Sequence, residues 1–320
     1  MNSRARVAAV LLAASTLVVA ACGSGGSSSS SSSSSASGQI AAVKVVGADA
    51  KKTPAITLPE KPFKVTKTET RVITEGKGAT LKSGQVASVS LAVVNGTSGK
   101  TVNSNYESAP TGLPVGDTTV IAGLKKALDN QKIGSRVLVA IPPADGFGTQ
   151  GATSLGIAAD DTMVVLMDIR SAVTMLPAAT GTAVAPKKGL PTVVFNKDKA
   201  ATITIPKGEK APTKLVVQPL VEGTGATVKK GQTVRATYTG VLWRNGKVFD
   251  SAWAHDPAYI EFPAGEGQVI KGWDTSVVGQ KVGSRLLLVV PPAQGYGSAG
   301  SGEIKGTDTM VFVMDILGAY

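Results

Sequence analysis

Residues 238–251 read YTGVLWRNGKVFDS. The pair Asn245-Gly246 inside this stretch is a strong signal for a tight hairpin turn. It separates a strand that ends near Trp243 from one that begins at Lys247. Residues rich in Val and Thr extend the first strand back to Thr233. The stretch therefore predicts an antiparallel β-hairpin.

The rest of the second half also predicts strands, with one short helix. Runs rich in Val, Leu and Thr, bounded by Gly, Pro and Asn, predict strands over Thr233–Leu242, Arg285–Val290 and Thr309–Leu317. A helix is expected over about Lys271–Gly279, and its counterpart in the first half over Ala122–Asn130. An antiparallel sheet curled over one short helix belongs to the α+β class.

The chain carries two copies of one module. Two pairs of segments match at an offset of 147 residues and a third pair matches at 149, so one loop differs by two residues. The pairs are GATLKSGQ at Gly78 with GATVKKGQ at Gly225, DTMVVLMDI at Asp161 with DTMVFVMDI at Asp308, and GSRVLVAIPPADGFG at Gly134 with GSRLLLVVPPAQGYG at Gly283. This is the signature of an internal duplication.

The similarity begins upstream of these segments, because VKVVGADAKKTPAITLP at Val43 parallels PTVVFNKDKAATITIP at Pro191. We therefore expect two domains with N-terminal extensions, over residues 43–172 and 191–320. The segment 173–190, which contains Pro177, Pro186, Gly181 and Gly189, is expected to be the linker.

The second module carries an ordered series of motifs: the hairpin sequence, then VIKGWD from Val269, PPAQGYG from Pro291 and MVFVMDIL from Met310. This series resembles the FKBP-type peptidyl-prolyl cis-trans isomerases, in which spaced aromatic residues line a small apolar pocket that accepts a proline ring. The resemblance covers residues 215–320. It implies two FKBP-like domains, each an antiparallel curled sheet around one short helix.

The resemblance also implies a site. The residues that fall on the family's catalytic pocket are Tyr238, Phe249, Asp250, Val269, Ile270, Trp273, Tyr296 and Phe312. In the family's arrangement Trp273 is the floor, the Ile270 N–H and the Tyr296 hydroxyl donate to substrate carbonyls, and Asp250 lies at the edge near Tyr238. Where the family has a further aromatic, the alignment leaves Ile260 and Phe262 as alternatives, and Ile304 is a further apolar contact. Each aromatic could equally be plain core.

Isomerisation of an X-Pro bond needs no nucleophile, metal or cofactor, because no bond is broken and the barrier arises from amide resonance. His255 is the sole histidine and Cys22 the sole cysteine. We interpret His255, beside Asp256, as a loop residue rather than the base of a Ser-His-Asp triad. Because Cys22 is the residue expected to carry a lipid, as argued below, cysteine-based zinc sites and thiol nucleophiles are not expected.

The first module lacks most of these aromatics. The positions of Tyr238, Phe249, Asp250, Trp273 and Phe312 hold Leu91, Val102, Asn103, Leu124 and Val165, and Phe147 replaces Tyr296. Aliphatic side chains can fill the same core volume, so the fold should persist. We expect this domain to turn over X-Pro bonds poorly or not at all.

The N-terminus predicts export. Residues 1–21 carry Arg4 and Arg6 followed by an apolar stretch, as in a secretory signal peptide. The sequence VAAC ending at Cys22 resembles a bacterial lipobox, which implies lipidation of Cys22 and an anchor at the outer face of the bacterial cell membrane. Residues 22–42, rich in Gly and Ser, are expected to be a flexible tether.

The net charge of +11 is dispersed, with no run of Lys or Arg longer than two residues, so nucleic-acid binding is disfavoured. The leading hypothesis is an isomerase acting on proline-containing exported or unfolded polypeptides, as a monomer, with macrolides as further possible ligands. Two alternatives are a non-catalytic chaperone that binds proline segments and a structural lipoprotein of the envelope.

Overall fold

The computed structural model describes residues 38–47, 52–196 and 199–320. The chain divides into two compact units, Met1–Ala172 and Val173–Tyr320. The predicted signal peptide and Cys22 lie outside the described residues, as does most of the predicted tether. Within the described part, no helix is long and apolar enough to cross a membrane.

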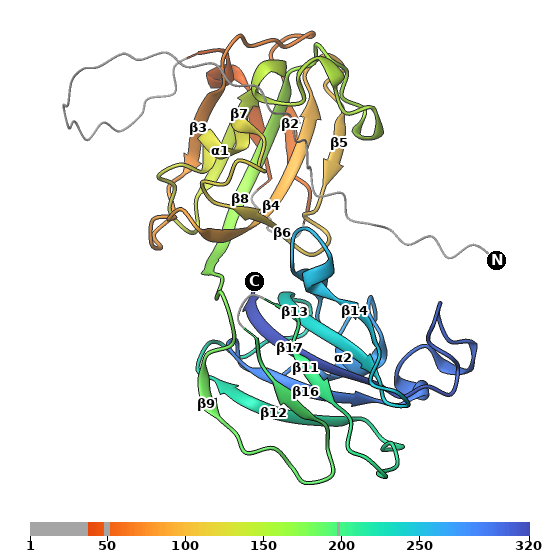
Figure 1. The fold of residues 1–320 in the computed structure, drawn as a ribbon. Helices are drawn as coiled ribbons and strands as arrows, with labels where there is room; N and C mark the ends of the chain where they lie inside the picture. The colour runs from red at the N-terminus through yellow and green to blue at the C-terminus, as the bar shows by residue number, and fades with distance from the viewer. Residues whose placement is uncertain (1–37, 48–51, 197–198) are drawn as a thin grey trace, which may run out of the picture. The chain divides into compact units, whose positions relative to one another are not determined.

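The first unit contains a six-stranded sheet in the order β3-β7-β8-β4-β5, with β6 paired to β4 (Figure 1). Its elements are η1 (Gln39–Ala42), β1 (Lys44–Val46), β2 (Ala55–Thr57), β3 (Glu69–Thr74), β4 (Gln85–Asn95), β5 (Thr101–Ser104), β6 (Thr111–Pro114), α1 (Ala122–Leu128), β7 (Arg136–Ile141), η2 (Pro143–Asp145), η3 (Gly148–Gln150), η4 (Thr153–Leu155) and β8 (Met163–Thr174).

The second unit repeats this arrangement and adds one strand. Its sheet has the order β14-β13-β17-β16-β12-β9, with β15 paired to β13. The elements are β9 (Gly181–Ala183), β10 (Thr192–Val194), β11 (Thr202–Thr204), β12 (Val216–Gly223), β13 (Thr233–Leu242), β14 (Val248–Ser251), η5 (Ala252–Ala254), β15 (Ile260–Pro263), α2 (Lys271–Val277), β16 (Arg285–Val290), η6 (Pro292–Gln294), η7 (Gly297–Ala299) and β17 (Met310–Ala319).

The predicted α+β class, with two curled antiparallel sheets that each carry one short helix, is confirmed. Strands β13 and β16 have the expected bounds, and both helices begin where expected. Both helices end two residues early, because Asp129 and Val278 are extended and are followed by Asn130 (φ 60°) and Gly279 (φ 85°). A residue in the left-handed region ends an α-helix.

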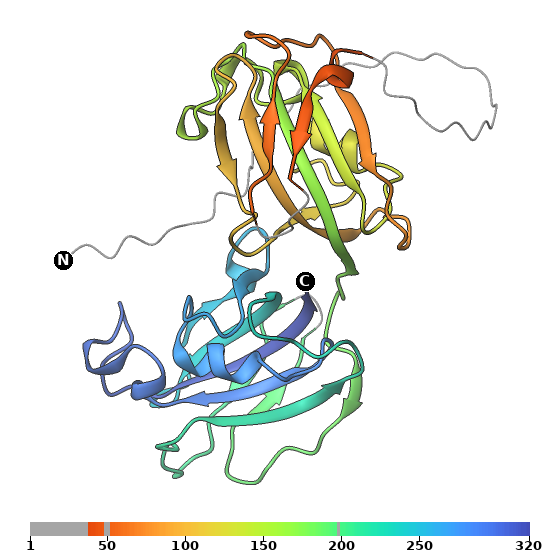
Figure 2. The same ribbon diagram turned by 180° about the vertical axis from the view of Figure 1, so that it is seen from behind.

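Each sheet is covered on both faces. In the second unit, α2 and the loops cover one face, and the hairpin β10–β11 covers the other, with Ile203 packing against Trp243 and Val311. The hairpin β1–β2 does the same in the first unit, where Figures 1 and 2 show it and α1 on opposite sides of the sheet. A strand buried on both faces reads as a continuous apolar run, which explains the sequence of β17.

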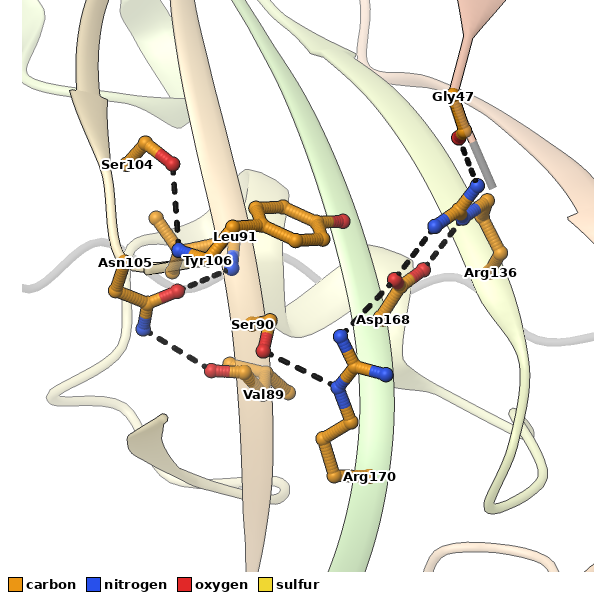
Figure 3. A network of polar contacts seen from close by, with 10 residues as sticks. All are labelled: Gly47, Val89, Ser90, Leu91, Ser104, Asn105, Tyr106, Arg136, Asp168 and Arg170. Carbon is orange, nitrogen blue, oxygen red and sulfur yellow. Dashed lines mark hydrogen bonds and ion pairs between the residues drawn. The ribbon is translucent and has the colours of Figure 1, made fainter. Parts of the chain in front are cut away.

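A buried ion pair lies under the covering hairpin of each unit. Arg285 contacts both carboxylate oxygens of Asp315, at 2.7 and 2.8 Å, and its guanidinium stacks 3.3 Å from the ring centroid of Phe195, just after β10. The same pair in the first unit is Arg136–Asp168, at 2.6 and 2.7 Å, and Arg136 also donates to the Gly47 carbonyl, just after β1 (Figure 3). These arginines fasten each hairpin to its sheet.

Two segments that the sequence suggested were outside the domains are folded. At the end of the predicted tether, η1 places Ile40 in the core of the first unit, with no exposed surface. Within the predicted linker, β9 pairs with β12, and the Leu176 N–H donates to the Leu317 carbonyl. The second unit therefore includes residues well before Pro191.

Candidate functional site

Four aromatic rings surround or adjoin Trp273 on the helix-covered face of the second sheet. The Trp273 ring centroid lies 4.8 Å from Tyr238 and 5.1 Å from Phe312, both in edge-on geometry, and 5.7 Å from Phe262. Phe249 meets Phe312 edge-on at 5.5 Å. These separations are those of favourable aromatic pairs. Trp273 is therefore the centre of an aromatic cluster built from β13, β14, β15, α2 and β17.

The backbone of α2 approaches a side chain of β16 closely, and this brings the helix and its tryptophan onto the sheet. A Cβ atom on Gly272 would lie 2.7 Å from a methyl group of Val290 on β16. Glycine at this position therefore allows the helix to approach the strand, and Trp273, the next residue, is held with 5% of its surface exposed.

Gly240 serves the same purpose in the middle of β13. A Cβ atom there would lie 2.7 Å from the Phe249 ring and 2.8 Å from the Phe312 ring. The two phenylalanines thus pack across the bare backbone of the strand. Sequence reasoning missed Gly240, although an isolated glycine inside a strand pattern is a signal for such a close approach.

Asp250 is the polar part of the site. The Tyr238 hydroxyl donates to its Oδ2 at 2.5 Å, and the Ser251 N–H donates to its Oδ1 at 2.8 Å. Burial raises the pKa of Asp250, but these hydrogen bonds and one from His255 outweigh it, and the pKa lies below its usual value. The carboxylate is therefore charged at neutral pH.

The hydrogen bond between Tyr238 and Asp250 follows from the register of β13 and β14. Gly240 on β13 is paired with Asp250 on β14, so Tyr238 and Asp250 lie near each other across the two strands. Burial, followed by the hydrogen bond to Asp250 and its charge, raises the pKa of Tyr238. The tyrosine consequently remains a hydrogen-bond donor at neutral pH.

The other predicted wall residues pack against the same cluster. Ile304 is buried, while Val269, Ile270 and Phe249 are partly buried. Tyr296 differs, because 44% of its surface is exposed. Burial of the rest, followed by the charge of Asp250, raises its pKa. Its hydroxyl is thus protonated at neutral pH.

The alternatives Ile260 and Phe262 both reach the cluster. They are two residues apart on β15 and therefore point to the same face of the strand. Phe262 is buried beside Trp273, and Ile260 is partly buried. The structure thus brings together every predicted apolar residue, while their roles in binding or turnover stay predictions.

The first unit has an aliphatic cluster in the corresponding place. Leu124 and Val165 are buried in it, and Leu91, Val102 and Phe147 are partly buried against it. Val93 stands where the second unit has Gly240. The valine fills space that the rings of Phe249 and Phe312 occupy in the second unit, so the volume of the cluster is kept while its flat surface is lost.

His255 lies on the loop after η5, as expected, and makes a contact that sequence reasoning missed. Its Nε2 lies 2.8 Å from Asp250 Oδ1. Among the described residues, no group of three or more His, Cys, Asp or Glu side chains is placed to hold a metal ion.

Comparison with known proteins gives concordant matches for both units. The family model of FKBP-type peptidyl-prolyl cis-trans isomerases matches residues 77–166 and 225–317, which together make up more than half of the chain. An FK506-binding protein from Streptomyces anulatus is 39% identical over 117 residues, which are 36% of this chain and 93% of the relative. A probable FK506-binding protein from Corynebacterium glutamicum is 37% identical over 117 residues, covering 37% and 96%.

These matches agree with the curled sheets and short helices of both units and with the predicted peptidyl-prolyl isomerase activity. The chain belongs to the FKBP-type peptidyl-prolyl cis-trans isomerase family and contains two segments of that family.

Proposed function

We propose that the isomerase site of this chain is the aromatic cluster of the second unit. The observation that carries the proposal is the position of Trp273, with three aromatic rings within 5.7 Å and a charged Asp250 hydrogen-bonded to the adjoining Tyr238. A proline ring needs a rigid apolar surface, and the indole supplies one.

The proposed mechanism is desolvation and twisting of the prolyl amide. Resonance opposes rotation with a barrier of about 18–20 kcal/mol. The twisted amide has lost its double-bond character and is less polar, so an apolar surface that removes water favours it over the planar ground state. Tyr296, which is exposed and protonated, and the Ile270 N–H at the start of α2 are the proposed donors to substrate carbonyls.

The first unit has neither the flat floor nor the carboxylate. Its cluster is aliphatic, and Asn103 stands where the second unit has Asp250. We therefore propose that it turns over X-Pro bonds poorly and serves as a spacer, a client-binding surface or a partner of the second unit.

The proposed clients are proline-containing unfolded or exported polypeptides. Support comes from the signal-like residues 1–21 and the lipobox-like sequence before Cys22, which would anchor a monomer to the outer face of the bacterial membrane. The names of the relatives refer to FK506, and macrolides of that kind are proposed ligands of the same cluster. A Cys22→Ser substitution should release the protein from the membrane fraction.

The activity is tested on the full chain with a short X-Pro peptide, by the rate of cis-to-trans conversion. The wild type should accelerate conversion, Trp273→Ala should abolish most of the acceleration, and the matched change Leu124→Ala in the first unit should preserve it. Far-ultraviolet circular dichroism of both variants checks that their folds persist. No acceleration by folded wild-type protein would contradict the proposal and leave a binding protein in its place.

Retained binding of unfolded clients by Trp273→Ala would show that client binding is separate from turnover. This measurement distinguishes an isomerase from a chaperone whose rotamase activity is incidental.

A further inference from the structure

His255 lies on the exposed loop after η5 and reaches back to the site. Its side chain is 58% exposed, and its Nε2 lies 2.8 Å from Oδ1 of Asp250 on β14. An exposed ion pair contributes little to global stability. The contact therefore contributes little to holding the fold together, and its direct effect is on the two side chains that it joins.

The contact is the outer end of a chain that leads to the aromatic floor. Oδ1 of Asp250 also accepts the Ser251 N–H, while Oδ2 accepts the Tyr238 hydroxyl. The Tyr238 ring in turn lies edge-on to Trp273 at 4.8 Å. Any rotation of the Asp250 carboxylate that breaks its contact with His255 also disturbs the bond to Tyr238.

The first unit lacks every link of this chain. The corresponding segment between β5 and β6, residues 105–110, is two residues shorter than residues 252–259 and contains no histidine, and the Ser108 hydroxyl in it donates to the Asn105 carbonyl of the same segment. The partners are replaced together, since Asn103 and Leu91 stand for Asp250 and Tyr238. If His255 were only an exposed loop residue with no role at the site, there would be no reason for it to occur in the same unit as Tyr238, Asp250 and Trp273.

We propose that His255 is a positioning residue of the isomerase site, which holds the Asp250 carboxylate and through it the Tyr238 hydroxyl, and holds them most firmly when its imidazole is protonated. This proposal rests on the proposed function. It assigns to the site a residue that touches no substrate in the mechanism above.

The charged groups around the imidazole determine how the strength of the contact between His255 and Asp250 changes with pH. The pKa of Asp250 lies below its usual value, and the pKa values of Tyr238 and Tyr296 lie above theirs. The carboxylate is therefore charged and both hydroxyls neutral from pH 5 to 8. Asp256, the next residue, adds a negative charge to the same exposed loop. Imidazole is the side chain that changes charge in this range, so the contact strengthens as pH falls.

The test compares kcat/KM for an X-Pro peptide at pH 5.5 and pH 8 in the full chain and in His255→Gln, His255→Arg and Lys207→Gln. Lys207→Gln is the matched control, because it removes an exposed charge in the turn that follows β11, the second strand of the hairpin that covers the other face of the sheet. The ratio of wild type to His255→Gln should be about 2 to 5 at pH 5.5, the range of an exposed ion pair, and close to 1 at pH 8.

His255→Arg, which is charged at both pH values, should keep the higher rate at both. Equal kcat/KM for wild type and His255→Gln at both pH values, with isomerisation still accelerated, would overturn the proposal and leave the proposed function standing. A loss that is the same at both pH values and is not rescued by arginine would also overturn it.

A second readout does not depend on turnover. Because the chain has one histidine, its imidazole resonances are assigned without ambiguity. At pH 6 they should move in Asp250→Asn and stay in place in Lys207→Gln. If the imidazole chemical shifts of Asp250→Asn were the same as those of the wild type, the proposal would be overturned, even if the protein were inactive.

Discussion

The two units share the same sheet and covering hairpin and differ in the side chains that pack on the opposite face of the sheet. Both have the same strand order, a covering hairpin and a buried Arg–Asp pair under that hairpin. They differ on the opposite face of the sheet, where one cluster is aromatic and the other aliphatic. The parts that fold the domain are thus the same in both units, while the cluster on the opposite face of the sheet differs.

The exchange of side chains between the two clusters is coordinated. The second unit combines Gly240 with Phe249 and Phe312, and the first combines Val93 with Val102 and Val165. A small residue on the strand accompanies large neighbours, and a larger one accompanies small neighbours. Close packing demands this, because overpacking and cavities both destabilise a core.

The shared framework predicts the largest effect. Asp315→Asn and Asp168→Asn should each destabilise their own unit by about 3 kcal/mol, because removing one partner leaves a buried guanidinium without its counter-ion. All three tryptophans, Trp243, Trp253 and Trp273, lie in the second unit. In urea, tryptophan fluorescence will therefore follow that unit, while far-ultraviolet circular dichroism follows both.

The fluorescence midpoint should fall in Asp315→Asn and stay unchanged in Asp168→Asn. Equal shifts in both variants would mean that the units unfold as one and that the comparison between them has no independent energetic basis.

The coordinated exchange predicts the next effect. Gly240→Val introduces the residue of the first unit into the second without making room for it. Since its Cβ would lie 2.7 and 2.8 Å from two rings, we expect a loss of about 2 kcal/mol from overpacking and a clear loss of isomerase activity. Urea unfolding followed by tryptophan fluorescence measures the first, and peptide isomerisation the second.

The triple variant Gly240→Val, Phe249→Val, Phe312→Val reproduces the combination of the first unit and should recover part of the stability without the activity. A single variant as stable as the wild type would refute the packing argument.

The sequence predicted most of this face, for identifiable reasons. Strand β13 had the expected bounds because it is rich in Val and Thr and is bounded by turn residues, and the spaced aromatics indicated the cluster. Strand β9 was missed because all three of its residues are exposed and small or polar, so no apolar pattern marks it. The contact of His255 was missed because it depends on the path of a loop, which no periodicity determines.

Ile260 and Phe262 show a third kind of limit. The alignment could not choose between them, and the strand brings both to the cluster because residues two apart share a face. An alignment assigns one residue to each position of the family, whereas in this strand two residues reach the cluster.

Charge at the edge of the site predicts a smaller effect. Asp250→Asn installs the residue found at Asn103 in the first unit and keeps the shape of the side chain. The Tyr238 hydroxyl then donates to a neutral amide, and a charge-assisted hydrogen bond is about twice as strong as a neutral one. We expect kcat/KM for an X-Pro peptide to fall about 10-fold, with the fold intact.

The reciprocal variant Asn103→Asp in the first unit should leave the rate unchanged. A gain of activity there would show that the first unit lacks a charge rather than a floor.

The smallest effect concerns the hydroxyls that face Asp250. Burial raises the pKa of Tyr238 and Tyr296, with the carboxylate adding to both shifts, so both hydroxyls ionise at a higher pH than an ordinary tyrosine does. The stability that this protonation provides is fully present below the unfolded value of about 10 and is lost only as pH rises through the folded pKa. The rate of peptide isomerisation should therefore change less than about 2-fold between pH 8 and 10, whereas an ordinary tyrosine would be half ionised at pH 10.

The tyrosinate absorbance of the folded protein provides the parallel measurement, and Tyr296→Phe separates the two hydroxyls. Loss of half the rate by pH 10 in the wild type, but not in Tyr296→Phe, would show that Tyr296 titrates as an exposed residue, and the contrast with Phe147 of the first unit would then rest on the hydroxyl alone.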